Sequence, residues 1–156
     1  MRVRSLLGTV LVVVAGCGEQ SPAAPETHYR LVLDTQQLMN WVIDPSADVI
    51  WGSAGSITTA EGEQDLAPVD DEGWVRVRHA GAMLAESGNL LMLPGRSRGA
   101  DWDEFAEGLM GIAERTIAAA DARDDERLFE LGGQLYNVCV ACHQQYMLAE
   151  AEASSP

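Results

Sequence analysis

Two cysteines and a histidine near the C-terminal end of the chain have the types and the spacing for covalent cofactor chemistry. They lie in Cys139-Val140-Ala141-Cys142-His143, which has the form C-x-x-C-H. This pattern is typical of c-type haem attachment, in which two thiols add across the haem vinyl groups. The adjacent imidazole can then reach the iron as its proximal ligand. The motif therefore predicts one covalent haem c, held by Cys139 and Cys142, with His143 on the iron.

Two haem-free interpretations of the same residues fit the sequence less well. A zinc site would want four ligands, and His28 and His79 are the only further histidines. A thiol–disulfide oxidoreductase would want C-x-x-C at the opening of a helix in a βαβ context. The motif here falls near the end of an expected helix, so haem attachment remains the favoured hypothesis.

The third cysteine, Cys17, follows a segment typical of export. Arg2 and Arg4 precede an apolar run, residues 6–15, that is too short to span a bilayer. The run ends Val14-Ala15-Gly16-Cys17, which resembles the lipobox of bacterial lipoproteins, where the peptide is cut before a cysteine that carries diacylglycerol. We therefore expect a signal peptide over 1–16 and lipidation of Cys17; an ordinary secretory signal with an incidental cysteine is the alternative.

Both interpretations place the mature chain outside the cytoplasm, where c-type haem is attached. We expect the periplasmic side of the cell envelope, and Gly18 after the cysteine favours the outer membrane. Residues 17–27 are rich in Pro, Ala, Ser and Glu and predict a flexible tether. Residues 28–150 would then form the folded domain and residues 151–156 a disordered tail.

Composition limits the partners of this domain. A chain of 156 residues predicts one core, and its net charge is −14, with ten Arg and no Lys. Such an acidic balance argues against nucleic acid or anionic lipid as a surface partner. The membrane is therefore expected to be reached through the N-terminal lipid anchor only. The charge is best interpreted as a solvated face, with an acidic docking surface for a basic redox partner as the alternative.

The motif lies on the last of four expected helices. Apolar residues of this helix recur at helical spacing after the acidic Asp124, Asp125 and Glu126, which suit a first turn. The stripe is Leu128, Leu131, Leu135, Val138 and Cys142. The motif is thus placed on the final turns of an amphipathic helix, with Cys142 on the core side.

Three earlier stretches show the same periodicity. One follows Gly99-Ala100-Asp101 and is joined to the last helix by a polar turn, 121–124; another spans 70–92, and the first, least regular stretch spans 31–60. Asp44-Pro45 should kink or interrupt that first stretch. The stripes are Trp102, Phe105, Leu109, Ile112, Thr116; Trp74, Val77, Gly81, Leu84, Gly88, Leu91; and Leu38, Trp41, Val42, Val49, Ile50.

Four helices and no strand-like segment predict an all-α fold, an up-and-down antiparallel four-helix bundle with haem c attached to the last helix. The glycines at 81 and 88 weaken their helix by about 1 kcal/mol each. Something bulky should therefore approach there, either a neighbouring backbone or a porphyrin edge, and packing is the simpler cause.

A four-helix bundle with C-x-x-C-H in its last helix resembles the cytochrome c′ family and its low-spin relatives such as cytochrome c-556. The likeness spans 31–149 and is tightest over the last two helices, through Phe105, Ala118 to Ala120, the motif and Tyr146. It implies a distal haem face lined by the first helix, where Met39 occupies the region of the low-spin relatives' methionine ligand. The chain departs from the family at Val140 and Met147, where basic residues that tune the proximal histidine are common.

Function depends on the sixth iron ligand. Met39 is the candidate distal ligand, which would give saturated iron suited to electron transfer; alternatively it is a core methionine. Met92, Met83 and His79 are further candidates for the distal ligand, although His79 is expected to face solvent. If the position is open, the iron is five-coordinate and binds NO or CO.

An envelope electron carrier that serves redox partner proteins is thus the leading hypothesis, and gas binding or detoxification is the alternative. An enzyme ranks third, because the sequence places no catalytic base or charged catalytic group on the distal side of the haem. Arg76 and Arg78 could act as such groups only if they point inward. A homodimer is also considered, since family relatives often pair through their first two helices; here Trp51 and Trp74 either form such a face or belong to the core.

Overall fold

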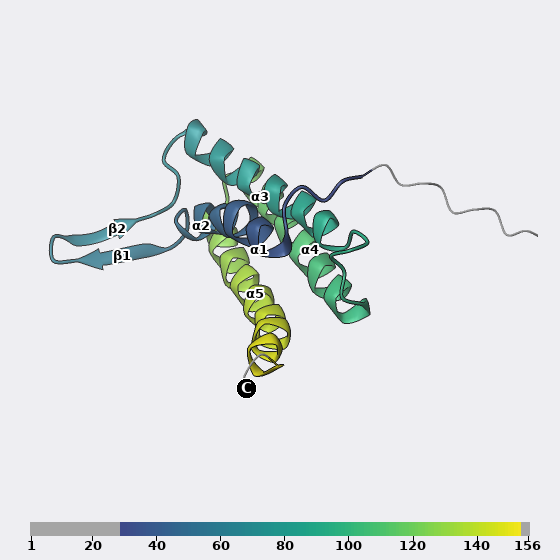
Figure 1. Cartoon of the computed structure of the whole chain (residues 1–156). Helices are drawn as coiled ribbons and strands as arrows, with labels where there is room; N and C mark the ends of the chain where they lie inside the picture. The colour runs from purple at the N-terminus through teal and green to yellow at the C-terminus, as the bar shows by residue number, and fades with distance from the viewer. Residues whose placement is uncertain (1–28, 154–156) are drawn as a thin grey trace, which may run out of the picture. The chain divides into compact units, whose positions relative to one another are not determined.

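The computed structural model describes residues 29–153, with side chains described as far as Met147. The signal peptide, Cys17, the tether and His28 lie outside the described residues. From Leu31 on, the chain forms one compact unit with an all-α fold, as predicted (Figure 1). Among residues 29–153, no helix is both long and apolar enough to cross a membrane.

Three long helices follow the predicted boundaries closely. They are α3 (Asp71–Leu91), α4 (Ala100–Ala122) and α5 (Asp125–Ala153). The Asp70 carboxylate caps α3 by accepting a hydrogen bond from the Gly73 N–H at 2.8 Å. α5 continues ten residues beyond His143, so the helix extends into the range 151–156 that was predicted as a tail.

The turn between α4 and α5 is shorter than predicted. Only Arg123 and Asp124 separate the helices, and Arg123 adopts a left-handed conformation with φ 55°. The N–H groups of these two residues donate to the Ala120 and Ala119 carbonyls, at 3.2 and 3.0 Å. These bonds satisfy carbonyls at the end of α4 and turn the chain back along it.

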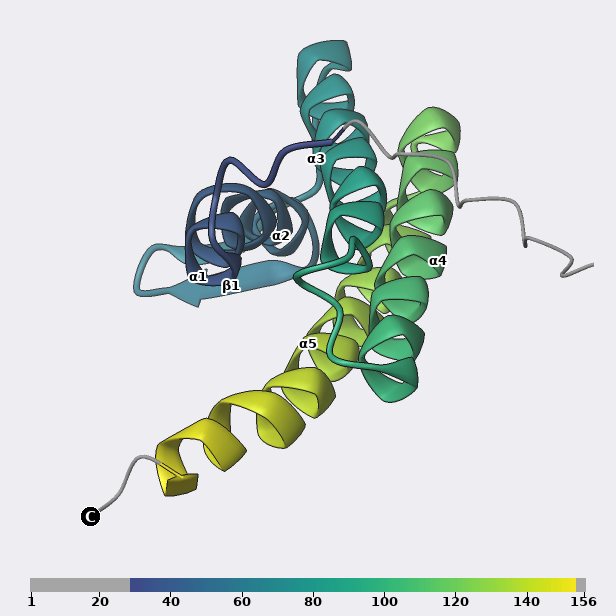
Figure 2. The same cartoon turned by 45° about the vertical axis from the view of Figure 1, so that its right-hand side comes forward.

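α3 and α4 lie side by side (Figure 2), and the two glycines of the α3 stripe face α4. A Cβ at Gly81 would lie 3.0 Å from the Ile117 side chain and 3.3 Å from the Ala113 carbonyl. A Cβ at Gly88 would overlap Met110. The predicted α3 stripe is buried, and close helix packing is the reason for its two glycines.

The first helical segment is continuous but irregular. It consists of α1 (Thr35–Leu38), a π-helical turn η1 (Met39–Ile43) and α2 (Asp44–Trp51). The predicted interruption at Asp44-Pro45 therefore takes the form of a wide turn just before the proline. The expected stripe is wrong at Trp41, which is 62% exposed, while Ile43 and Ala47 take core positions. The wide turn shifts the register after Leu38 by one residue.

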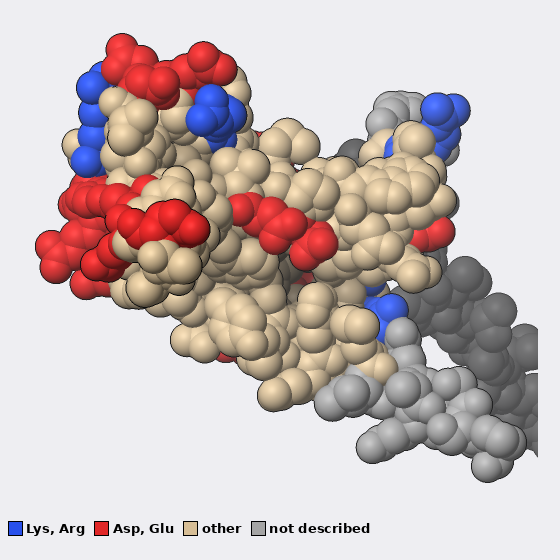
Figure 3. Space-filling view, turned by 90° about the vertical axis from the view of Figure 1, so that its left-hand side faces the viewer, with Lys and Arg blue, Asp and Glu red and all other residues tan. Residues whose placement is uncertain are grey.

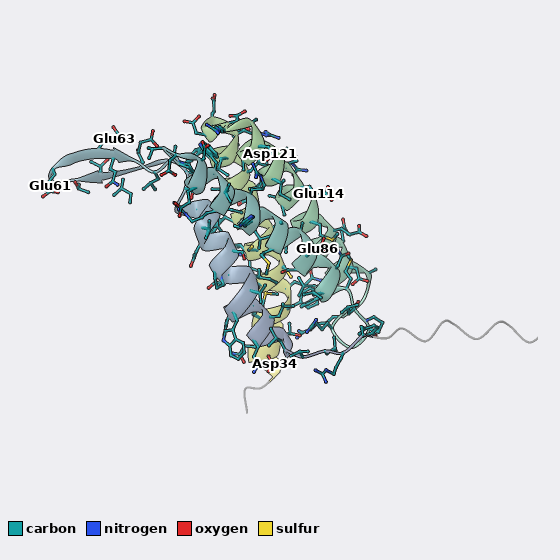
Figure 4. The ribbon with its side chains drawn as sticks, turned by 90° about the horizontal axis from the view of Figure 1, so that it is seen from above. Asp34, Glu61, Glu63, Glu86, Glu114 and Asp121 are labelled. Carbon is teal, nitrogen blue, oxygen red and sulfur yellow. The ribbon has the colours of Figure 1, made fainter. Side chains whose placement is uncertain are left out.

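The prediction of no strands is also wrong. Strands β1 (Ser56–Thr59) and β2 (Gly62–Asp65) pair antiparallel, with Ser56 opposite Asp65 and Thr59 opposite Gly62. The β-branched run in β1 favours extended backbone, and Gly62, with φ 133°, lets the chain reverse. Every strand residue is exposed, and Figure 4 shows Glu61 and Glu63 on this hairpin, away from the helices.

The surface is strongly acidic on the side of the hairpin. Figure 3 shows Asp and Glu side chains gathered there, whereas much of the same view carries no charged side chain. Residues 131–149, which contain the haem motif, include no Arg, Asp or Glu, although the chain has 34 such residues. The motif therefore lies in the least charged part of an acidic molecule.

Candidate functional site

The C-x-x-C-H motif lies on α5 with its three reactive side chains accessible. Cys139 and Cys142 are partly buried free thiols, and His143 is exposed. The helix is anchored by Leu128, Leu131 and Leu135, all fully buried, so that the next turns carry the motif along the edge of the core. The sequence prediction of helix and face is confirmed here; what the face binds is a separate question.

The motif opens into a cavity of about 630 Å³. Pockets of roughly 300–1,000 Å³ are the usual size for small-molecule and cofactor sites. Cys139, Cys142 and His143 line it from α5, and Met39 lines it from the first helical segment. The cavity therefore brings together all four residues that the sequence singled out for a haem.

In the first helical segment, residues that line the cavity recur at every fourth position. Thr35, Met39, Ile43, Ala47 and Trp51 all line the cavity. A regular α-helix has 3.6 residues per turn, so a four-residue repeat would drift steadily off one face. The π-helical turn contains one extra residue and removes much of this drift. The turn thus keeps Met39 and α2 on the cavity side together.

Pro45 gives a physical reason for the wide turn. Proline has no N–H, and in a regular helix its ring clashes with the carbonyl four residues earlier. Here the Asp44 N–H donates to the Met39 carbonyl, a bond of π-helical spacing. The Ser46 hydroxyl donates to the Val42 carbonyl at 2.6 Å. These two bonds satisfy carbonyls where the regular ladder is interrupted.

Two Trp–Tyr pairs bracket the motif along the cavity. Trp51 of α2 packs edge-on against Tyr136 with ring centroids 6.3 Å apart, and its indole N–H donates to the Gly132 carbonyl at 3.0 Å. Trp102 of α4 packs edge-on against Tyr146 at 4.9 Å. Each pair ties α5 to another helix, on either side of the motif in the sequence. The position of the motif is therefore fixed from both directions.

Arg98, which the sequence did not single out, also lines the cavity. It precedes α4, and its guanidinium lies 4.9 Å from the Trp102 ring centroid and 5.8 Å from that of Tyr146. Such distances are within the range of cation–π attraction. A single Arg in a loop carries no periodic signal, so only the folded chain reveals its place beside the motif.

Burial raises the pKa of both motif thiols. The pKa of Cys139 is raised from 9.0 to about 11, chiefly because burial disfavours the thiolate and then because of Cys142 and Asp44. The pKa of Cys142 is also raised by burial, while nearby Arg98 opposes the rise. The two thiols are thus not activated as nucleophiles in the manner of a redox-active dithiol.

The other candidate ligands do not reach this cavity. Met83 is exposed on α3, Met92 packs against the core beyond the end of α3, and His79 is exposed as predicted; none of the three lines the cavity. Within residues 29–153, no group of three or more His, Cys, Asp or Glu is arranged to hold a metal ion. Met39 is the methionine that the first helical segment contributes.

Several apolar side chains of the cavity are left open to solvent. Tyr136 and Met147 are each 58% exposed and both line it. Of the residues that line the cavity, Asp44 and Arg98 are the acidic and basic ones. A large, mostly uncharged cavity with exposed aromatic and thioether groups suits an apolar ligand that carries few charges.

Comparison with known proteins identified no relative. No family model matches the chain, and neither a curated protein nor a solved structure matches it.

Proposed function

We propose that this chain is an exported c-type cytochrome that carries one covalent haem and transfers electrons. The observation that carries the proposal is the shared cavity: Cys139, Cys142 and His143 line it from α5, and Met39 lines it from the first helical segment. C-x-x-C-H is specific for haem c attachment. The volume and apolar lining of the cavity add independent support.

The two cysteines would hold the cofactor by thioether bonds. Each thiol adds across one vinyl group: the sulfur bonds to one vinyl carbon and the hydrogen moves to the other, so no oxidant is needed. Burial raises the pKa of both thiols, which would slow disulfide formation before attachment. His143, one residue on, would supply the proximal nitrogen.

Met39 is the proposed distal ligand. It is partly buried, lines the cavity and belongs to the wall whose register the π-helical turn maintains. Bound haem supplies the one-electron ferric–ferrous couple, and a thioether ligand raises its potential. Trp51, Trp102 and Phe105 line the same cavity and would shield the haem from water, and no catalytic residue is assigned.

The wider proposal follows from the sequence. Residues 1–16 would be a lipoprotein signal peptide and Cys17 a lipid anchor that holds the domain on the periplasmic side of the envelope. We propose that the four helical segments form an up-and-down bundle of the cytochrome c′ and c-556 kind. Its redox partners would be other envelope proteins. Of the two tryptophans considered for a dimer face, Trp74 is buried in the core.

The alternative function is binding of NO or CO by a five-coordinate haem. One observation favours it: Met39 shares its wall with the polar Thr35, Gln36 and Asn40, so the cavity also offers room and hydrogen-bonding groups beside the distal position. The two functions differ in whether Met39 occupies the iron, and optical spectroscopy distinguishes them.

The test is expression of the full chain in a host that attaches haem c. We expect a red protein that keeps its haem after denaturing electrophoresis and shows ferric low-spin bands with a weak near-infrared sulfur–iron absorption. Met39→Ala should keep the covalent haem and lose that absorption, whereas Met83→Ala, an exposed methionine off the cavity, should retain it. Cys139→Ser with Cys142→Ser should release the haem.

Other outcomes would redirect the proposal. A high-spin spectrum that shifts on adding NO or CO would replace electron transfer by gas binding. A colourless protein from a competent host would eliminate haem, and the proposed function with it.

A further inference from the structure

Arg96 is a buried cation to which the proposed function gives no role. It lies in the loop between α3 and α4 and is 7% exposed. Its guanidinium donates to the Leu33 carbonyl at 2.7 Å and to the Leu90 carbonyl at 3.1 Å, while its Nε is buried without a partner. Burying a charge is costly unless polar groups compensate it. What Arg96 holds together is therefore of interest.

The two carbonyls that Arg96 binds belong to different parts of the fold. Leu90 is in the last turn of α3, whose terminal carbonyls have no partners within the helix. Their partial negative charge favours a cation at this end and offsets part of the burial cost. Leu33 belongs to the lead-in segment, residues 31–34, which continues directly into α1. One side chain thus joins the lead-in segment to the end of α3.

The lead-in segment contacts the same loop a second time. A Cβ at Gly95 would lie 3.1 Å from Cδ1 of Leu31, so the Leu31 side chain packs directly on this glycine. The segment ends at Asp34, the cap of α1, and Met39 follows that four-residue helix at once. A helix of one turn has little stability of its own, so its position depends on what holds its ends.

We propose that Arg96 is a positioning residue for the distal ligand: by joining the lead-in segment to the end of α3, it holds α1 and Met39 at the cavity. This inference rests on the proposed function, in which Met39 is the distal ligand of the haem. Arg96 does not line the cavity, and the C-x-x-C-H motif does not predict it. Its effect on the iron would pass through the backbone of the first helical segment.

The expected effect is local. Loss of a charge-assisted hydrogen bond at the start of α1 should raise the local opening of this helix about tenfold. Met39 would leave the iron when its helix opens, so a competing iron ligand should bind more tightly by about the same factor. A residue that served global stability alone would not change this competition.

The experiment uses the matured full chain, with imidazole as the competing iron ligand. Loss of the near-infrared sulfur–iron absorption reports displacement of Met39. We expect Arg96→Gln to keep its covalent haem and to bind imidazole about tenfold more tightly than the parent. Arg96→Lys should lie between the two, because it retains the charge but lacks the planar fork that reaches both carbonyls.

Two further variants separate positioning from stability. Asp70→Ala removes the cap at the opposite end of α3 and should leave the imidazole affinity unchanged, although it lowers the free energy of unfolding. Leu31→Ala removes an exposed side chain from the lead-in segment and should tighten imidazole binding by a smaller factor than Arg96→Gln. If Arg96→Gln does not fold, the comparison of Leu31→Ala with Asp70→Ala decides, and equal affinities would overturn the proposal.

Failure of this inference can be told apart from failure of the proposed function. Equal imidazole affinities in the parent and Arg96→Gln, or equal effects of Arg96→Gln and Asp70→Ala, overturn the role of Arg96 alone. A red parent without the sulfur–iron absorption removes Met39 as ligand and the role of Arg96 with it.

A colourless parent removes the proposed function, and hydrogen exchange of the unmatured chain then judges whether Arg96 holds α1. The amides of residues 35–39 should exchange about tenfold faster in Arg96→Gln than in Asp70→Ala. Equal exchange in these two variants would overturn the proposal.

Discussion

Two of the helical segments that line the cavity, α5 and the first segment, are built differently. α5 is one continuous helix anchored by three fully buried leucines ahead of the motif. The first segment changes from α to π and back to α within residues 35–51, and its opening helix α1 has only four residues. The proposed permanent bonds thus lie on the rigid wall, and the proposed exchangeable ligand, Met39, lies on the adjustable one.

This difference is one of anchorage as much as of geometry. The α5 wall is tied to α2 by Trp51 and to α4 by Trp102, through ring contacts at Tyr136 and Tyr146. The start of the first wall depends on Leu38 in the core and on Asp34 at its cap. A haem that is bonded to α5 would therefore keep its place while the distal side relaxes.

Matched leucine truncations should give the largest contrast. Leu135→Ala and Leu38→Ala remove the same atoms from positions that are 0% and 1% exposed. Buried Leu→Ala changes cost about 2–5 kcal/mol, and less where the surroundings can collapse. We expect Leu135→Ala to lie near the top of this range and Leu38→Ala near the bottom, measured by urea unfolding of the unmatured protein.

Equal losses at the two positions would mean that both walls are equally anchored. Urea midpoints should be compared at constant slope, because a changed slope signals loss of two-state behaviour rather than lost packing. The retained helicity of each variant can be followed by circular dichroism in the same titration.

The thiol on the rigid wall should react slowly. With its pKa raised from 9.0 to about 11, Cys139 has about a hundredfold less thiolate at neutral pH than an ordinary cysteine. We expect its alkylation by iodoacetamide in the unmatured protein to be slower by about that factor than in urea, as read by peptide mass spectrometry. The rate should go on rising with pH up to about 11, since the folded thiol holds its proton until then.

A rate that levels off near pH 9 would show that the thiol is not desolvated. Asp44→Asn is the matched variant, because Asp44 on the first wall also raises the pKa of this thiol, and its removal should accelerate alkylation slightly.

The smallest contrast should come from the two aspartate caps. Asp34 caps α1 with a capping box, accepting from the Gln37 N–H at 2.7 Å, and Asp70 caps α3. Loss of either cap costs about 1 kcal/mol. Asp34→Ala should loosen only the first wall, seen as faster local hydrogen exchange, whereas Asp70→Ala should lower the free energy of global unfolding.

The same hydrogen-exchange experiment can also give the opposite result. If Asp34→Ala reduced protection throughout α5 as strongly as in residues 35–51, the first wall would be part of the global folding unit rather than a separate, weaker one.

The sequence predicted the rigid part of this molecule well and the adjustable part poorly. Asp70, the regular spacing of the α3 to α5 stripes and the acidic start of α5 are local signals, so they could be interpreted without tertiary information. Pro45 signalled an interruption, but whether the chain would break, kink or widen into a π-helical turn depends on where Leu38 and Ile43 must both pack. β1 has no alternating pattern that could predict a strand, because it is short and wholly exposed.

The candidate site divides in the same way. Cys139, Cys142 and His143 are recognisable because their chemistry requires near neighbours in sequence. The cavity itself, the two Trp–Tyr pairs and Arg98 arise from contacts between helices, and no periodic pattern marks them. Met39 was singled out because it lies in the region where low-spin relatives of the cytochrome c′ family carry a methionine ligand. Its place on the cavity wall could be seen only once the register of η1 was known.

The turn of the β1–β2 hairpin is a suitable place to insert additional sequence. None of the residues of β1 and β2 is buried, and the turn at Ala60 and Glu61 is surrounded by solvent. Exposed loop tips of this kind tolerate inserted sequence because no core packing is disturbed. An affinity peptide or an electrode-binding sequence can therefore be built into this turn, and it would hold the protein on a surface while the cavity and its two walls remain as they are.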